Sequence, residues 1–541
     1  MTTKTSKKSE LDPRAEVTPP ALGFSGMLRW AWAQLVNMRT AIMLLLLLAV
    51  AAVPGSLFPQ RPADPDGVAK YLEDHPTAGP ILDFLQLFDV YSSVWFSAIY
   101  LLLFISLIGC IWPRTIKHYK FMRSDPVRTP RFLHRLPVSG ALTYAAGTDA
   151  EATAQNLAEA LRKRSYRAIV REEDGAFTVS AERGYMREVG NLLFHVSLVG
   201  VLVSVGIGGL FGYNGQRIIT QGDSWANALV SYDNFYPGSA FTESALAPYR
   251  MRLDDFEAVF DRQATSNFGM PLDFTAYLTT QQGPDAPEKK ETLKVNSPLT
   301  VGATSVYLVG NGYAPDLVVR DGNGDIAMEG PVIARPNDSV YTSIVVIKAP
   351  DARPEQLGFV GFLLPTSVMG EDKVAYSADP ELLNPELNLN SYYGDLGLDE
   401  GIPGNVYVLD TDELTELNSR TSENGGIVLK PGESYELPDN KGSIEFKGIK
   451  RYIAIDIHYD PGKYGALVFS VLAMVSLAGS LFIRRRRAFF RVPISDNGTR
   501  AEYGFLARGE DFGLTEEADA VLKQAEKTLR SSLELDQEED K

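Results

Sequence analysis

The segment GNLLFHVSLVGVLVSVGIGGLF, residues 190–211, decides the fold because it is long and apolar enough to cross a lipid bilayer. Similar apolar blocks occupy residues 37–58, 94–112 and 464–483, and the quoted block begins at residue 189. Helices of about 19–23 residues span the ~30 Å hydrocarbon layer at 1.5 Å per residue. The sequence therefore predicts a polytopic α-helical membrane protein with four transmembrane helices.

Clusters of basic residues flank these blocks on one side, whereas the loop between the first two blocks has only Arg61 and Lys70. The clusters precede the first block, they follow the second in residues 113–135, and they follow the fourth in the run Arg484–Arg487. Lysine and arginine in short loops mark the cytoplasmic side. We therefore expect both termini in the cytoplasm and the large segment 212–463 outside it. The triplet at residues 49–51 leaves signal cleavage open, but it lies inside the apolar run, so a retained first helix is expected.

The apolar blocks divide the chain into nine parts with distinct compositions. In chain order we expect a cytoplasmic tail with an interfacial helix, a transmembrane helix, an outer loop, a transmembrane helix, a cytoplasmic α/β module, a transmembrane helix, an extracytoplasmic β domain, a transmembrane helix and a cytoplasmic acidic tail. Their bounds are 1–36, 37–58, 59–93, 94–112, 113–188, 189–211, 212–463, 464–483 and 484–541.

The cytoplasmic module is expected to be small and to mix helix with strand. Residues 148–166 have the composition of a helix, with Thr148 or Asp149 as its N-cap. Residues 167–182 are typical of a hairpin that turns at Asp174 and Gly175. The C-terminal segment is acidic and partly helical, and it is interpreted as a tail.

Residues 212–463 consist of short alternating runs separated by turn residues, such as SVYTSIVVIKA and SIEFKGIKRYIAI. This pattern is typical of an all-β, sandwich-like domain. The main interruption is residues 380–402, which we expect to be a loop or a short helix. The outer loop at 59–93 begins with prolines and is expected to hold one or two short helices.

His195 is an ionisable side chain inside an apolar block. A polar group at this depth needs partners, because leaving it unpaired in hydrocarbon costs about 2–3 kcal/mol or more. Three roles stay open: a structural hydrogen bond between helices, a ligand for a metal or haem, and a proton relay. The row Gly200, Ser204, Gly208 and Gly212 on the opposite side predicts close packing against a neighbouring helix.

Four other histidines have weaker claims as ligands. His458 is the best of them because it lies just before the last apolar block, and His75, His118 and His134 lie in loops or in the basic stretch. The sequence contains no H-E-x-x-H motif and no convincing Ser-His-Asp set, so no catalytic residue is predicted. The arginine run is a topology signal that suits anionic lipid, and no nucleic-acid partner is expected.

The single cysteine, Cys110, excludes several chemistries for this chain. One thiol allows no disulfide framework, no C-x-x-C redox pair and no C-x-x-C-H haem attachment site. The chain is therefore neither a thiol oxidoreductase nor itself a c-type cytochrome.

Particular stretches resemble the ResB family of membrane subunits of System II cytochrome c biogenesis. They are PGSLFPQ at 54–60, GNLLFH at 190–195 and DPG at 460–462, and the resemblance covers nearly the whole chain. It implies a plasma membrane protein of bacteria that works with a ResC/CcsA-type integral membrane partner. Together such proteins carry haem b outward and support its covalent attachment to apocytochrome c.

The same resemblance assigns a role to His195, because the family's intramembrane histidine matches it. That residue is thought to be one axial ligand of the haem iron, with the other supplied by the partner. The resemblance also implies that a tryptophan-rich haem-handling motif belongs to the partner. The tryptophans here are scattered, so this chain is expected to be non-catalytic alone and to act as a subunit of a haem lyase or synthase complex. The alternative is a non-catalytic scaffold that holds partner and apocytochrome, with His195 structural.

Overall fold

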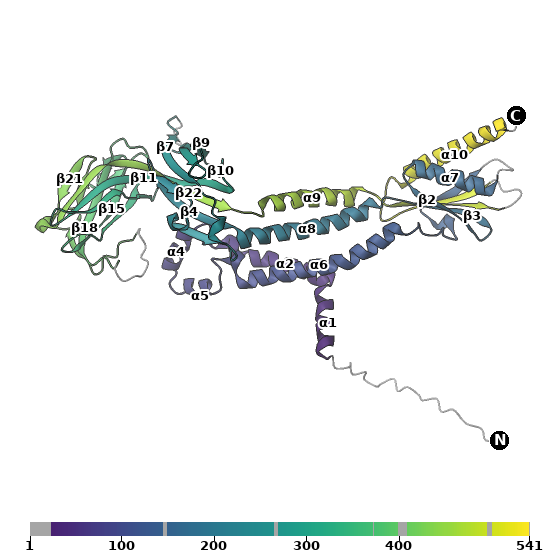
Figure 1. The fold of residues 1–541 in the computed structure, drawn as a ribbon, viewed down its shortest axis with the longest axis horizontal. Helices are drawn as coiled ribbons and strands as arrows, with labels where there is room; N and C mark the ends of the chain where they lie inside the picture. The colour runs from purple at the N-terminus through teal and green to yellow at the C-terminus, as the bar shows by residue number, and fades with distance from the viewer. Residues whose placement is uncertain are drawn as a thin grey trace, which may run out of the picture. The chain divides into compact units, whose positions relative to one another are not determined.

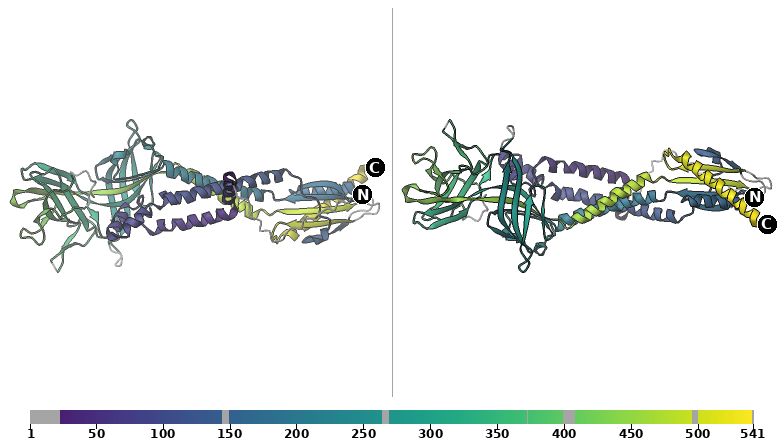
Figure 2. Two further views of the ribbon diagram at one scale, coloured as in Figure 1. Left: turned by 90° about the horizontal axis from the view of Figure 1, so that it is seen from below. Right: turned by 90° about the horizontal axis from the view of Figure 1, so that it is seen from above.

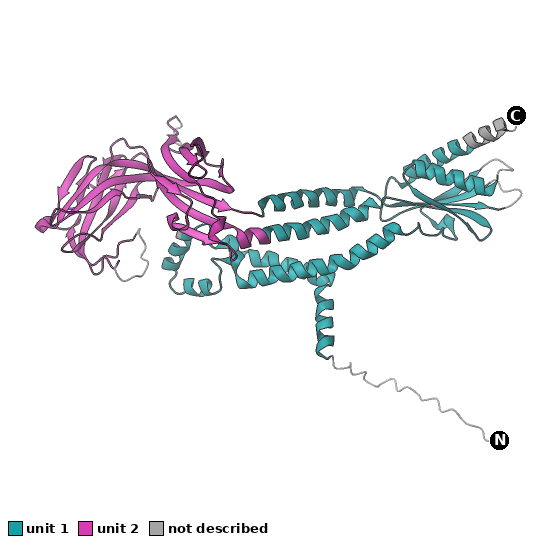
Figure 3. Ribbon diagram, in the orientation of Figure 1, with its two compact units in different colours: residues 1–205, 462–541 teal, residues 206–461 magenta. Residues whose placement is uncertain are grey.

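The computed structural model describes residues 23–143, 149–263, 269–371, 373–398, 408–494 and 500–539 (Figure 1). The chain forms two compact units (Figure 3). The first combines residues 1–205 with residues 462–541, and the second is residues 206–461.

Four helical segments in the described part of the chain are long and apolar enough to cross a membrane. They are α2 with α3 (Met38–Ala52 and Pro54–Leu57), α6 (Val94–Arg123), α8 (Met186–Phe211) and α9 (Lys463–Phe482). Most of their side chains are not buried, as lipid-facing helices require. The four predicted helices are confirmed, and they indicate a membrane protein.

Small residues bring α8 and α9 together, and the two helices lie side by side in Figures 1 and 2. A Cβ atom added at Gly200 would lie 2.4 Å from the ring of Phe469, and one added at Gly465 would lie 2.6 Å from the Ser204 hydroxyl. These distances leave no room for side chains, so small residues set the closeness of the two helices. The prediction of close packing is confirmed for Gly200 and Ser204.

Shorter helices precede and connect the apolar ones. Trp30 and Trp32 are each 56% exposed on α1 (Phe24–Leu35), which buries none of its side chains. Both rings are therefore free to enter a membrane interface. The first loop contains α4 (Pro65–Asp74) and α5 (Gly79–Phe84), so the expected short helices are confirmed.

A five-stranded antiparallel sheet with the order β1-β24-β23-β3-β2 belongs to the same unit as these helices. Its strands are β1 (Val138–Thr143), β2 (Arg167–Glu173), β3 (Ala176–Arg183), β23 (Arg486–Pro493) and β24 (Arg500–Ala507). Two helices, α7 (Ala150–Lys163) and α10 (Leu514–Glu539), pack with it around one hydrophobic core. We call this assembly the α/β module.

The α/β module differs from the acidic tail that the sequence analysis expected at residues 484–541. Strands β23 and β24 lie at the centre of the sheet, and β23 pairs directly with β3. Alternate residues of β23, Ala488, Phe490 and Val492, are fully buried in the core beneath α7 and α10. The sheet is therefore completed only when the C-terminal segment joins residues 138–183.

Beyond the end of α8, the described residues of the second unit form β-sheets with only short 3-10 helices between the strands, so the predicted β domain is confirmed. Two long strands, β11 (Thr304–Asp321) and β22 (Gly442–Tyr459), pair over nearly their whole length in a seven-stranded sheet. The other strands of this sheet are β4 (Tyr213–Thr220), β6 (Asn234–Pro237), β10 (Leu299–Val301), β12 (Ile326–Pro331) and β21 (Glu433–Glu436).

Two further sheets pack against opposite ends of these long strands and create two cores. In the first core, the parts of β11 and β22 around Ile455 pack against a four-stranded sheet. That sheet contains β5 (Ser224–Ala226), β7 (Arg250–Phe260), β8 (Pro271–Gln281) and β9 (Lys289–Lys294). In the second core, the parts of β11 and β22 around Phe446 pack against a six-stranded sheet. That sheet contains β13 (Arg335–Pro336), β14 (Ser343–Ala349), β15 (Gln356–Leu364), β18 (Glu386–Gly394), β19 (Thr415–Asn418) and β20 (Ile427–Leu429).

Strand β18 corrects one expectation, because it lies within residues 380–402, where we expected a loop or short helix. Its Leu387 and Leu389 alternate with polar residues and are buried in the second core. A small hairpin of β16 (Ser367–Met369) and β17 (Ala375–Ser377) completes the unit. Residues 399–402 lie outside the described part of the chain.

Candidate functional site

His195 lies on α8, and its ring bonds to the backbone of its own helix. Nδ1 is 2.7 Å from the carbonyl oxygen of Asn191, one turn earlier. A carbonyl only accepts, so Nδ1 carries the proton and donates, and in the neutral ring Nε2 keeps its lone pair. No partner for Nε2 is found in the described part of the chain. The ring edge packs against Phe194, with centroids 5.2 Å apart.

The face of α8 that carries His195 also carries the contacts to α6. Residues 188, 195 and 202 are spaced by seven, so they lie on one face of the helix. At one end Glu188 pairs with His118 of α6, with Oε2 and Nδ1 3.1 Å apart. At the other end the Tyr100 hydroxyl of α6 donates to the carbonyl oxygen of Leu202. His195 therefore sits between two contacts that tie α8 to α6.

A buried ionic cluster surrounds Glu188 where the α/β module meets the helices. The Arg485 side chain is only 7% exposed, and it pairs with Glu182 at 2.9 Å and with Glu188. Its guanidinium carbon lies 4.3 Å from the ring centroid of Phe121 on α6. Arg508 also donates to Glu188, at 2.7 Å. These charges fix the start of α8 relative to α6 and the sheet.

The protonation of this cluster follows from burial opposed by hydrogen bonds. Burial alone raises the pKa of Glu182, but hydrogen bonds from Arg487, Tyr185 and Arg485 outweigh it, so the pKa is lowered. Burial, together with its hydrogen bond to Glu182, raises the pKa of Tyr185 to about 12. Glu182 is therefore ionised and Tyr185 neutral across physiological pH.

The structure does not bring the other sequence candidates to His195. His458 lies on β22 in the second unit, where its side chain is 42% exposed and packs near Tyr307, with ring centroids 5.2 Å apart. His75 stacks on Tyr71, and His134 is exposed. Across the described ranges, no group of three His, Cys, Asp or Glu residues is arranged to hold a metal ion.

Sequence reasoning missed the cluster around Glu188. The sequence alone marks His118 only as a weak candidate in the basic stretch and Arg485 only as part of a topology signal. The one available signal is the position of Glu188, one heptad before His195 on the same helical face. Its partners come from residues 70 and 297 positions away in the chain, which no local pattern reveals.

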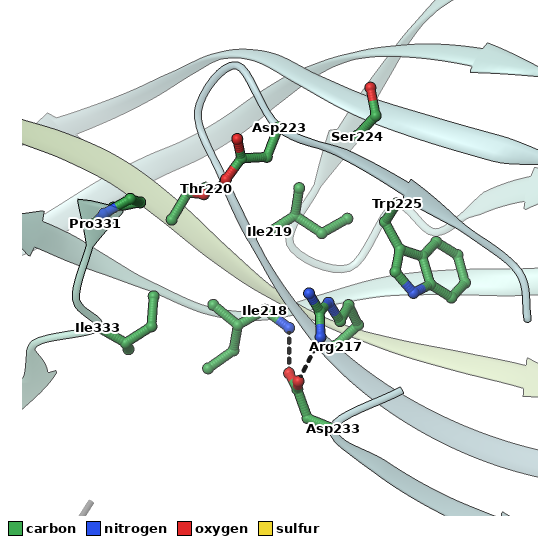
Figure 4. Close-up of a pocket in the computed structure, with 10 residues that line it drawn as sticks. All are labelled: Arg217, Ile218, Ile219, Thr220, Asp223, Ser224, Trp225, Asp233, Pro331 and Ile333. Atoms are coloured by element: carbon green, nitrogen blue, oxygen red, sulfur yellow. Dashed lines mark hydrogen bonds and ion pairs between the residues drawn. The ribbon is translucent and has the colours of Figure 1, made fainter. Parts of the chain in front are cut away.

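The second unit contains a separate cavity of about 260 Å³ beside β4 (Figure 4). On one side lie Arg217 and Asp233, whose side chains form an ion pair at 2.7 Å. Asp233 also accepts a hydrogen bond from the Ile218 N–H at 2.7 Å. The opposite wall is apolar and comes from Pro331 and Ile333.

Comparisons with known proteins place the chain in context. A sequence model of the ResB-like family matches residues 38–519. Over 200 residues the chain is 34% identical to the cytochrome c biogenesis protein CcsB of Synechococcus sp. (strain CC9311), covering 36% of this chain and 44% of that protein. Over 281 residues it is 30% identical to CcsB of Synechococcus sp. (strain WH7803), covering 51% and 59%.

A third relative is the cytochrome c biogenesis protein ResB of Bacillus subtilis (strain 168). It is 25% identical over 296 residues, covering 51% of this chain and 52% of that protein. The chain therefore spans about half the length of the curated relatives that it matches.

Proposed function

The chain belongs to the ResB-like family, and from this premise we propose that it works in cytochrome c maturation as a haem-delivery subunit. In this proposal the subunit moves haem b from the cytoplasmic side of the plasma membrane to the outer face. A ResC/CcsA-type membrane protein is its partner, and the complex supports covalent attachment of haem to apocytochrome c. The chain itself contributes binding and positioning.

The orientation of His195 is the observation that carries the proposal. A hydrogen bond from Nδ1 to a backbone carbonyl fixes the ring and its tautomer, as is usual for histidines that ligate metals. The Nε2 lone pair then remains for an axial bond to haem iron. A purely structural role would instead call for hydrogen bonds to a neighbouring helix, and none is found among the described residues.

The ionic cluster supports the same role for α8. Glu188 lies two turns from His195, about 10 Å along the helix axis. Arg508 is largely exposed there, and its cationic side chain suits the carboxylates of a haem whose iron is held at His195. In the proposed orientation this end of α8 faces the cytoplasm, where haem enters.

The second unit is proposed to lie outside the cytoplasm and to engage the partner or apocytochrome c. The basic clusters that flank the helices support this orientation.

The test is the haem content of the full chain purified with a co-expressed ResC/CcsA-type partner. We expect His195→Ala to remove most of the co-purified haem, whereas His458→Ala, the matched control, retains it. If both variants keep the wild-type haem content, the chain is better described as a scaffold for partner and apocytochrome c.

A further inference from the structure

The edge of strand β4 is only partly covered. On one side β4 pairs with β22 along its whole length, from Tyr213 to Thr220. On the other side it pairs with β6 only as far as Gln216. Past that point no described strand continues the pairing, and the cavity of Figure 4 opens beside residues 218–220.

Two backbone groups at this edge lack partners in the described part of the chain. In an antiparallel strand, alternate residues direct both backbone groups to the same side. The Asp233 N–H donates to the Gln216 carbonyl, so Ile218 and Thr220 also face the open side. Asp233 caps the Ile218 N–H, but the Ile218 carbonyl and the Thr220 N–H are left unpaired.

These groups match the backbone of an added strand. The Thr220 N–H can donate to a peptide carbonyl, and the Ile218 carbonyl can accept from a peptide N–H. The apolar side chains of Pro331 and Ile333 form the facing wall, where an alternating strand would place its apolar residues (Figure 4).

Charge favours a cationic occupant. The carboxylates of Asp223 and Asp233 both line the cavity. Residues 206–461 contain 37 acidic and 18 basic side chains, so the unit carries a formal charge of −19. Such a field attracts basic chains and disfavours acidic ones.

We propose that the cleft beside residues 217–220 binds an extended, cationic polypeptide segment, which adds a short strand to the open edge of β4. The proposal deepens and rests on the proposed function, in which an unfolded apocytochrome is the polypeptide handled outside the membrane. Few backbone hydrogen bonds are available, so binding is weak and reversible, as release of a finished product requires.

The experiment measures fluorescence polarisation of labelled synthetic peptides with the full-length protein in detergent. The main probe alternates lysine with valine. One control peptide replaces lysine by glutamate, and another is N-methylated at every residue, so that neither of its edges retains backbone donors. The variant is Ser224→Lys, which adds a positive charge to an exposed residue lining the cavity. Its matched control is Thr415→Lys, which adds the same charge to exposed β19.

We expect the lysine peptide to bind wild-type protein and to bind Ser224→Lys about fivefold more weakly, as one added like charge at a partly exposed site predicts. Thr415→Lys should match wild type, Ser224→Glu should bind at least as well, and N-methylation should weaken binding. The proposal is overturned if the two lysine variants bind alike, if the glutamate peptide binds equally well, or if N-methylation has no effect.

Haem content is measured on the same preparations to separate this proposal from the function on which it rests. Normal haem with unaltered peptide binding in Ser224→Lys rejects the cleft alone. If Ser224→Lys weakens peptide binding but His195→Ala leaves the haem content unchanged, the haem role of His195 is rejected and the peptide-binding cleft is supported.

Discussion

Asp511 offers a quantitative test of how the C-terminal segment is built into the α/β module. Its side chain is 3% exposed and accepts hydrogen bonds from Arg486, at 2.7 Å from Nε, from Arg484 and from the Gly513 N–H. The Arg486 hydrogen bond, with that of Arg484, holds the pKa of Asp511 at about 2, against 3.8 for an unperturbed carboxyl. Such a depression corresponds to about 2 kcal/mol of folding free energy.

We therefore expect Asp511→Asn to lower the opening free energy of the α/β module by about 2 kcal/mol at pH 7. Because the folded pKa lies below the unfolded one, the stabilisation is present above the unfolded pKa and is lost as pH falls towards 2. Roughly half of it should remain at pH 3. The assay is hydrogen exchange of β23 and β24 amides in the full-length protein, corrected for intrinsic rates. The reasoning is refuted if Asp511→Asn lowers the opening free energy equally at pH 7 and pH 2.5, or if it does not lower it at pH 7.

Substitutions at three further places test the packing. Phe490→Ala removes a fully buried ring and should cost about 3–5 kcal/mol, whereas Phe512→Ala, at an 89% exposed site, should be neutral within about 0.5 kcal/mol; urea-dependent proteolysis of the module measures both. Arg485→Met leaves two carboxylates short of a cation and should destabilise by about 3–5 kcal/mol, read as a lower melting temperature in detergent. Gly200→Ala should cost about 1–3 kcal/mol by clashing with Phe469, and Phe469→Ala in the same chain should recover part of that loss in the same melt.

The helices and the β unit were predictable because each is encoded locally. An apolar run long enough for a bilayer needs no distant partner to be recognised, and α8 matches its predicted block within three residues at its start. Alternation likewise marks parts of β11 and β22, such as residues 304–309 and 453–458, where buried residues follow a period of two. Asp149 also caps α7 as expected, through a hydrogen bond to the Ala152 N–H.

The rest depended on pairing between segments far apart in the chain. Strand β23 begins within a run of four arginines, whose charge pattern indicates membrane topology and hides the alternation of Ala488, Phe490 and Val492. Its partner β3 lies about 300 residues earlier, and no local signal records that contact. Strand β18 was missed because the prolines and glycines that flank it are typical of loops.

The candidate site shows the same division. His195 stood out because an imidazole in an apolar helix is costly without partners. The bond from its Nδ1 to Asn191, and the cluster that joins Glu188 to His118 and Arg485, required coordinates. These contacts fix the orientation of the His195 ring and bind the face of α8 that carries it to α6, on both sides of His195.

The visible absorption spectrum of the complex with its partner tests the central claim most directly. We predict six-coordinate, low-spin haem bands in the wild type, their loss in His195→Ala, and their partial return when imidazole is added to that variant. An unchanged spectrum and haem content in His195→Ala would contradict the account.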